Sequence, residues 1–220
     1  MKKEVVRLGI IAAVALAALA GAAGYYMSGE ETKKLAQQAS QPPPAPSNLV
    51  RPHSHILGPA DAKVTIVEFL DPECESCRAM YPMVKQLMAE YTGKVRLVIR
   101  YMPFHPNSMY AASALEAAAE QGKYWEMLEV LFANQQQWGS HHAPKPELIP
   151  DYARQLGLDM AAFDRTVGST GHKAMVQTDE ADGKALGVTG TPTFFVNGRM
   201  LDRLGYEGLK AMIEAELARS

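Results

Sequence analysis

Both cysteines of this 220-residue chain, Cys74 and Cys77, lie in one short segment and are separated by two residues. An apolar, β-branched run at Val64–Leu70 precedes them, and a helical pattern of apolar residues follows them. A C-x-x-C motif between a strand and a helix is typical of a redox dithiol at a helix N-terminus. Because the chain contains no other cysteine, neither thiol can form a disulfide elsewhere in the monomer. The pair therefore either carries out thiol chemistry or closes a tight local bridge.

A helix N-terminus favours an anion, because its first backbone N–H groups lack intrahelical partners and its dipole is positive there. Cys74 is therefore predicted to be the exposed nucleophile, with its thiolate stabilised by those amides. Cys77, one turn inside the helix, is predicted to be shielded and to act as the resolving thiol. Glu75 between the cysteines, together with Asp71 and Glu73 before them, should oppose ionisation of Cys74, because like charges repel.

The surrounding pattern predicts an α/β fold. A second strand is expected at 94–101, and the apolar residues before it recur at helical spacing, so strand, helix and strand fit one right-handed βαβ unit. Helical patterns occupy about 107–187, with separate helices expected at 110–121, 123–138, 146–156, 160–167 and 173–186. Strand character returns at Thr193–Val196, and the dipeptide Asn197-Gly198 predicts a tight hairpin turn before an amphipathic helix at 207–219. A helical insertion thus separates the βαβ half from a ββα half.

An uncharged, mostly apolar stretch spans residues 8–27 and follows the basic residues Lys2, Lys3 and Arg7. Its length just spans a bilayer, and the basic flank places the N-terminus in the cytoplasm and the rest of the chain outside it. Small residues at 18–23 leave cleavage of a signal peptide open as the alternative. We expect a single-pass protein of the bacterial inner membrane with its domain in the periplasm or extracytoplasmic space, or a cleaved, soluble periplasmic protein. Both place the domain where disulfides persist.

Residues 28–57 lack apolar periodicity and include a proline-rich run at 42–46, which favours an extended, semi-rigid linker. The folded domain is expected to occupy residues 58–220. An ordered N-terminal extension packed on that domain is the alternative. A net charge of −2 provides no basic surface for nucleic acid.

Three segments resemble the thioredoxin superfamily, and within it the DsbA-like exported thiol–disulfide oxidoreductases: 58–69 with the following dithiol, 122–126, and 188–198 with its Thr191-Pro192 pair. The resemblance implies a thioredoxin-like fold with an inserted helical domain. It also implies that Pro192 is a cis-proline facing the dithiol, and that the Thr191 backbone binds the substrate peptide. An ordinary trans-proline at the start of a strand is the alternative.

The resemblance further implies that Glu68, six residues before Cys74, lies beneath the dithiol and relays protons to and from Cys77. A buried carboxylate is unfavourable unless it is paired or functional. A solvated Glu68 at the edge of the strand is the alternative. Pro82 should kink the helix that follows the dithiol and have a structural role. Strongly oxidising members of the family often have a histidine between the cysteines, so the acidic segment here predicts a potential below the about −120 mV of DsbA.

The sequence therefore predicts a membrane-tethered oxidoreductase that exchanges disulfides with exported proteins through Cys74 and Cys77, in a direction that stays open. It requires no organic cofactor or metal, but it requires a redox partner, for which a membrane protein is a candidate. A copper- or zinc-handling protein that uses both thiols and a nearby Met or His is the competing hypothesis. The spacings of the histidines match no zinc template, and His53 and His55 fall within the predicted linker. A redox-inactive module with a stapling disulfide is a third hypothesis.

Overall fold

The computed structural model describes residues 48–219. The predicted membrane segment at 8–27 and most of the predicted linker lie outside this range. Within it, no helix combines the length and the apolar character needed to cross a bilayer.

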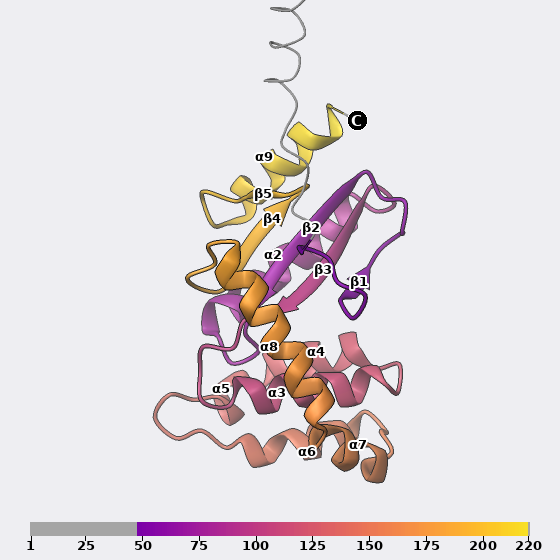
Figure 1. Cartoon of the computed structure of the whole chain (residues 1–220), viewed down its shortest axis with the longest axis vertical. Helices are drawn as coiled ribbons and strands as arrows, with labels where there is room; N and C mark the ends of the chain where they lie inside the picture. The colour runs from indigo at the N-terminus through magenta and orange to yellow at the C-terminus, as the bar shows by residue number, and fades with distance from the viewer. Residues whose placement is uncertain (1–47, 220) are drawn as a thin grey trace, which may run out of the picture. The chain divides into compact units, whose positions relative to one another are not determined.

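A five-stranded mixed sheet forms the centre of the domain, in the order β1-β3-β2-β4-β5 (Figure 1). Strands β2 and β3 run parallel and are joined through helix α2, whereas the other neighbouring strands are antiparallel. The strands are β1 (His55–Leu57), β2 (Val64–Leu70), β3 (Val95–Tyr101), β4 (Thr193–Val196) and β5 (Arg199–Met200), and α2 spans Glu75–Glu90. The predicted bounds of β2 and β4 are confirmed, and the βαβ unit has the predicted order.

Strands β2 and β3 are nearly continuous buried runs, as expected for central strands that are covered on both faces. Alternate residues of β2 face opposite sides. Ile66, Glu68 and Leu70 therefore share the face that packs against α2 and the C-terminal helix α9 (Tyr206–Leu217). Phe69 lies on the other face, where Gly183 of helix α8 approaches its ring closely. The dithiol helix and Glu68 are thus on the same side of the sheet.

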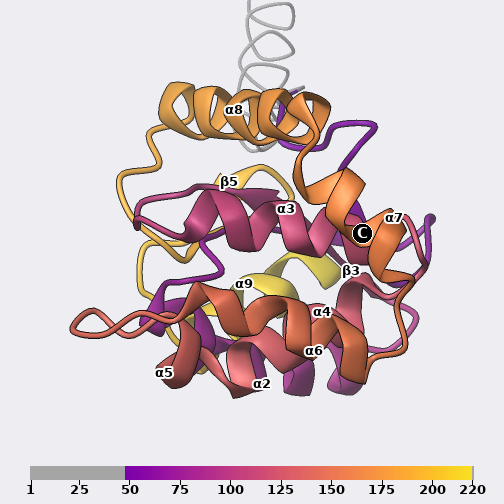
Figure 2. The same cartoon turned by 90° about the horizontal axis from the view of Figure 1, so that it is seen from below.

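Helices fill the chain between β3 and β4, and α3 lies among them in contact with α4, α7 and α8 (Figure 2). Because α3 is alanine-rich and buried around most of its circumference, its neighbours can approach closely. The elements are α3 (Ser108–Ala119), α4 (Tyr124–Ala133), α5 (Gln135–Trp138), a 3-10 turn at Pro146–Leu148, α6 (Ile149–Gln155), α7 (Met160–Val167) and α8 (Thr170–Ala185).

The single helix predicted for 123–138 is wrong, because the chain breaks at Asn134 into α4 and α5. The backbone of Asn134 is not helical, and its side-chain Nδ2 donates to the Val130 carbonyl at 2.8 Å. Asparagine commonly replaces helical backbone hydrogen bonds in this way. The predicted hairpin turn is confirmed, since Asn197 and Gly198 both have positive φ between the paired residues Val196 and Arg199.

The predicted linker is wrong for its last ten residues, 48–57, which we call the N-terminal strap. Leu49 is only 2% exposed, and β1 pairs with β3 at the edge of the sheet. His55 contacts Glu116 at 2.7 Å and stacks on Tyr124 with ring centroids 3.7 Å apart. These partners lie far along the chain, so local periodicity could not reveal them. The alternative of an ordered extension is therefore correct for this segment.

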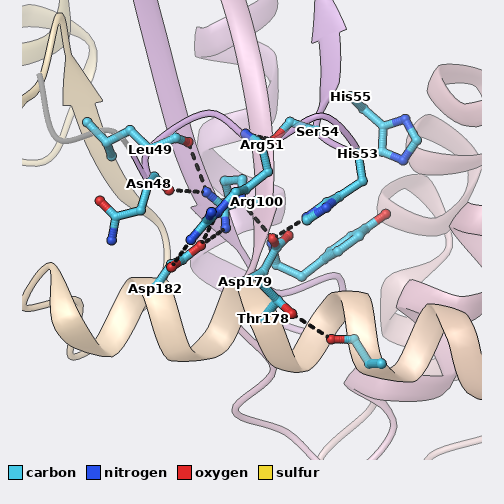
Figure 3. A network of polar contacts seen from close by, with 12 residues as sticks. Asn48, Leu49, Arg51, His53, Ser54, His55, Arg100, Thr178, Asp179 and Asp182 are labelled. Carbon is cyan, nitrogen blue, oxygen red and sulfur yellow. Dashed lines mark hydrogen bonds and ion pairs between the residues drawn. The ribbon is translucent and has the colours of Figure 1, made fainter.

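A buried charge network holds the strap against β3 and α8 (Figure 3). The Arg100 side chain is fully buried and donates to Asp179 at 2.7 Å and to Asp182 at 2.6 Å. Its third nitrogen donates to the carbonyls of Asn48 at 2.5 Å and Leu49 at 3.0 Å. Within the strap, Arg51 also pairs with Asp182 at 2.7 Å, and His53 contacts Asp179 at 2.6 Å. The hydrogen bond from Arg51, with further contributions from Arg100, lowers the pKa of Asp182 to about 2.

Candidate active site

The dithiol lies where β2 ends and α2 begins. Cys74 is the N-cap of α2, and Cys77 lies within its first turn. Both are free thiols in this structure. Cys77 is fully buried, whereas Cys74 is 7% exposed, so Cys74 is mostly buried rather than exposed as predicted. The predicted order of accessibility, with the first thiol more open than the second, is nevertheless confirmed.

Hydrogen bonds converge on the sulfur of Cys74. Its largest stabilising contact is with the thiol of Cys77, and further contributions come from the side chain of Thr191 and from the backbone N–H groups of Cys77 and Ser76. These interactions outweigh the effect of partial burial and lower the pKa of Cys74 to about 5. The prediction that backbone amides at the helix start stabilise a thiolate here is thus confirmed.

Cys77 has the opposite properties. Burial raises its pKa well above the ordinary value, and the hydrogen bond with Cys74 and the charges of Glu68 and Cys74 add to this increase. A backbone hydrogen bond from Asp71 acts in the other direction but is the weaker influence. In the reduced protein at neutral pH, the first sulfur is therefore an anion and the second is a neutral thiol.

Glu68 lies beneath this pair on the α2 side of β2 and is 3% exposed. Burial raises its pKa to about 8, and the negative charge of Cys74 contributes to that increase. The predicted inward orientation of Glu68 is confirmed, and the alternative of a solvated edge residue is wrong. A carboxyl group with this pKa is mostly protonated at neutral pH.

The loop before β4 approaches the dithiol from the opposite side. The Thr191–Pro192 bond is cis, as predicted, and the Thr191 carbonyl oxygen lies 3.3 Å from the sulfur of Cys74. Pro82 lies inside α2, also as predicted.

The sequence predicts that the acidic residues near the dithiol oppose ionisation of Cys74, yet the pKa of Cys74 is lowered in their presence. Asp71 accepts hydrogen bonds from the backbone N–H groups of Glu73 and Phe104, both at 2.8 Å. Glu73 accepts from the backbone and side chain of Asn107 at 2.6 and 2.7 Å. The Glu75 side chain is 62% exposed and is therefore screened by water. Each carboxylate is thus stabilised by donors or by solvent, and the charge at Cys74 is tolerated.

Sequence reasoning missed Gln135, which fixes the backbone around the dithiol. Its buried Nε2 donates to the carbonyls of Pro72 and Cys74, both at 2.9 Å, and its Oε1 accepts from Arg78 at 3.0 Å. Because Gln135 lies in α5, about 60 residues after these partners, no local motif could have identified it.

The histidines that suggested a metal site bind carboxylates instead, since His53 contacts Asp179 and His55 contacts Glu116. Within residues 48–219, no group of three or more His, Cys, Asp or Glu side chains is arranged to hold a metal ion.

The low pKa of Cys74 leads to a prediction for the reduced protein. The rate of its alkylation by iodoacetamide should follow an ionisation with a midpoint near pH 5, measured by stopped flow. A free cysteine with a pKa of about 8.5 would instead be only about 3% thiolate at pH 7. Cys77→Ala should raise the midpoint, because it removes the largest stabilising hydrogen bond, and Cys77→Ser should raise it less, because it keeps a donor. A wild-type midpoint above about pH 8 would contradict the geometry described here.

Comparison with known proteins places the fold in one family. The family described as Thioredoxin matches residues 51–215. A thioredoxin-like oxidoreductase from Silicibacter pomeroyi is 27% identical with a TM-score of 0.66, over 77% of this chain and 95% of that one. Oxidised BdbD from Bacillus subtilis is 26% identical with a TM-score of 0.64, over 75% and 93%. Wolbachia pipientis alpha-DsbA1, 19% identical with a TM-score of 0.71 over 79% and 97%, shares the fold.

Several curated relatives are longer than this chain. A protein named Na(+)/H(+) antiporter NhaA from Herminiimonas arsenicoxydans is 38% identical over 189 residues, which are 85% of this chain and 28% of the relative. Na(+)/H(+) antiporter NhaA 3 from Salinispora tropica is 40% identical over 148 residues, which are 66% and 22%. The chain thus spans about a quarter of the length of these relatives.

Proposed function

The chain belongs to the thioredoxin family and is an oxidoreductase of the DsbA-like type, and from this premise we propose that it exchanges disulfides with exported protein substrates through Cys74 and Cys77. One observation carries the proposal. The N-cap and the first turn of α2 hold one sulfur with a pKa of about 5 and a second sulfur whose pKa is raised well above its ordinary value. This asymmetry supports the proposal that Cys74 is the nucleophile and leaving group and that Cys77 is the shielded resolving thiol.

In the oxidising direction, a substrate thiolate attacks the Cys74 sulfur of the Cys74–Cys77 disulfide. A mixed disulfide forms and Cys77 leaves, taking up a proton. The second substrate thiol then loses its proton and attacks the first substrate sulfur, so that the substrate disulfide forms and the Cys74 thiolate leaves. Two electrons pass from the substrate to the dithiol. In the reducing direction the same steps run backwards, and the redox partner decides which direction operates.

The cis Thr191–Pro192 loop is proposed to hold the substrate chain. The carbonyl of Thr191 is adjacent to the sulfur of Cys74, and an extended peptide can pair with backbone groups presented in this way. The substrate cysteine would then be held beside Cys74 in an orientation suited to attack, which accelerates the exchange reaction.

Glu68 is proposed to supply and accept the proton of Cys77. Its charge and that of Cys77 influence each other, and its pKa of about 8 allows it to hold or release a proton near neutral pH. The charge of Glu68 raises the pKa of Cys77, and the charge of Cys74 in turn raises the pKa of Glu68, so the carboxyl group is coupled to the dithiol.

Glu68→Gln should therefore slow the step in which Cys77 leaves or attacks, on the order of a hundredfold. The pH dependence of that step near pH 8 should disappear, while the alkylation midpoint of Cys74 changes little. Stability provides a second measurement. Because the folded-state pKa of Glu68 is raised, its contribution to the free energy of unfolding should fall as pH rises from about 4.5 to about 8. The lowered pKa of Cys74 acts in the opposite direction in both proteins, so the stability advantage of the reduced wild type over Glu68→Gln should shrink over this pH range. Wild-type rates and pH dependence in the variant would refute the role of Glu68.

Equilibration with glutathione tests the proposed function itself. Wild-type protein is incubated in mixtures of reduced and oxidised glutathione, and its dithiol is trapped by alkylation and counted by mass spectrometry. Reversible conversion between dithiol and disulfide supports the proposal, and failure to convert across the whole range overturns it. A potential near −270 mV, about that of thioredoxin, would indicate a reductase, and one near about −120 mV an oxidase.

The chain is further proposed to be tethered to the bacterial inner membrane by residues 8–27, with residues 28–47 as the linker and the domain from 48 onward in the periplasm. The uncharged stretch after Lys2, Lys3 and Arg7 supports this arrangement. A membrane protein could then serve as redox partner, since both would lie at the same surface. Retention of the full-length chain in membranes after alkaline extraction is expected, whereas a soluble product lacking about 20 residues would indicate cleavage.

A further inference from the structure

His105, in the loop between β3 and α3, is held firmly beside the start of α2. Its ring Nδ1 lies 2.7 Å from Oδ2 of Asp71, and its backbone N–H donates to the same oxygen at 3.2 Å. The backbone N–H also contacts the hydroxyl of Ser108 at 3.1 Å. The side chain is 24% exposed, so the ring is positioned by the protein while one edge remains open to solvent.

Asp71 connects this imidazole to the backbone of Cys74 and to the sulfur of Cys77. Its carbonyl accepts a hydrogen bond from the backbone N–H of Cys74 at 3.0 Å, and its own backbone contacts the sulfur of Cys77. Its carboxylate meanwhile orients His105. One fully buried residue thus fixes both the active-site loop and the ring beside it.

The surroundings of His105 favour its charged form. Partial burial lowers its pKa, but the hydrogen bond and charge of Asp71 and the negative charges of Cys74 and Glu73 raise it, and the net shift is upward. An interaction between two charges acts equally on both. A positive charge on His105 therefore stabilises the thiolate of Cys74 to the same extent that the thiolate stabilises the imidazolium.

We propose that His105, oriented by Asp71, supplies the positive charge that stabilises the Cys74 thiolate when it leaves the mixed disulfide. The inference rests on the proposed function, because it assigns a role within that exchange. In this step the second substrate sulfur bonds to the first, the bond between the first substrate sulfur and Cys74 breaks, and Cys74 keeps the electron pair. His105 retains its proton throughout. The proton lost by the second substrate thiol passes to solvent.

The other titratable groups around His105 come from three segments. Asp71 and Glu73 lie in the loop after β2, and Cys74 and Glu75 lie at the start of α2. His141, after α5, has its ring centroid 5.4 Å from that of His105 and its Nε2 3.9 Å from Glu75. Because His141 is 51% exposed and contacts Glu75 rather than Asp71, it provides a matched control for removal of a nearby histidine.

The test compares His105→Asn with His141→Asn in the full chain. Asparagine keeps a side-chain donor for Asp71 but cannot carry a charge. His105→Asn should raise the Cys74 alkylation midpoint and shift the glutathione equilibrium toward the disulfide form, about threefold to tenfold, as expected for a partly exposed charge pair. His141→Asn should change neither measurement. Equal shifts in both variants, or none in His105→Asn, would overturn the inference.

A measurement on the unmodified protein does not depend on folding of a variant. The His105 ring proton can be titrated by NMR in the reduced and disulfide forms, and its pKa should be higher in the reduced form, where Cys74 is an anion. Equal values would also refute the inference. If the wild-type dithiol fails to equilibrate with glutathione, the proposed function is wrong; if it equilibrates while His105 has no effect, only the present inference fails.

Discussion

Cys74→Ser is expected to reduce disulfide exchange to the background of the buffer thiols. The sulfur of Cys74 is the group on which the thiol of Cys77, Thr191 and two backbone amides converge to stabilise an anion. A serine hydroxyl remains protonated at neutral pH and is a poor nucleophile without a general base. Exchange should be measured as the rate of oxidation of a peptide dithiol by the disulfide form of the wild type and by the variant in the same glutathione buffer.

Cys77→Ser is the matched control, because it removes the other sulfur and leaves the nucleophile. Its Cys74 thiolate should still attack a substrate disulfide, bonding to one sulfur while the other leaves as a thiolate, but no resolving thiol at position 77 can release the mixed disulfide. Mass spectrometry under non-reducing conditions should therefore detect the trapped adduct in Cys77→Ser and not in Cys74→Ser. Adducts on Cys77 in the Cys74→Ser variant at comparable rates would contradict the assigned roles.

Arg100→Met should lower the free energy of unfolding by about 3–5 kcal/mol, the usual effect of removing one partner of a buried ion pair. Methionine fills part of the same space but leaves Asp179 and Asp182 without the guanidinium that lies 2.7 and 2.6 Å from them. It also removes the donor to the carbonyls of Asn48 and Leu49. Urea denaturation of the reduced proteins measures the difference, and hydrogen exchange should show faster opening of the N-terminal strap.

Lys85→Met is the control for loss of a surface cation. Lys85 pairs with Glu129 at 2.9 Å, but the two side chains are 50% and 57% exposed, so the change should stay within about 1 kcal/mol. The buried network around Arg100 should also make the free energy of unfolding depend on pH. Because the pKa of Asp182 is lowered to about 2, its stabilisation is complete above its ordinary pKa of 3.8 and is lost as pH falls toward 2. Similar losses of free energy of unfolding in Arg100→Met and Lys85→Met would show that burial of Arg100 has no special effect.

The sequence could predict much of the framework, because several features depend on neighbouring residues alone. The run Val64–Leu70 is apolar at five of its seven positions, on both faces of the strand, which predicts a strand covered on both faces. Asn197-Gly198 accommodates two positive φ values, which sets the hairpin register. The order of Cys74 and Cys77 on the helix start likewise follows from their spacing, and so does the more accessible position of the first thiol.

The sequence could not predict the electrostatics around the dithiol, because these depend on partners brought together by folding. Glu73 looks like a charge that opposes the Cys74 thiolate until Asn107 is seen to donate two hydrogen bonds to it. Gln135 looks like the first of three consecutive glutamines until its amide is found to donate to the carbonyls beside the dithiol.

The local sequence thus determined strand β2, the start of α2 with its two thiols, and the Asn197-Gly198 turn, because each depends on residues close together in the chain. Tertiary structure alone decided that residues 48–57 join the domain, since their partners Asp179 and Glu116 are on distant helices. It also decided which groups surround Cys74. The physical reason is common to both: charges and hydrogen bonds act over a few ångströms of space, whatever their separation in sequence.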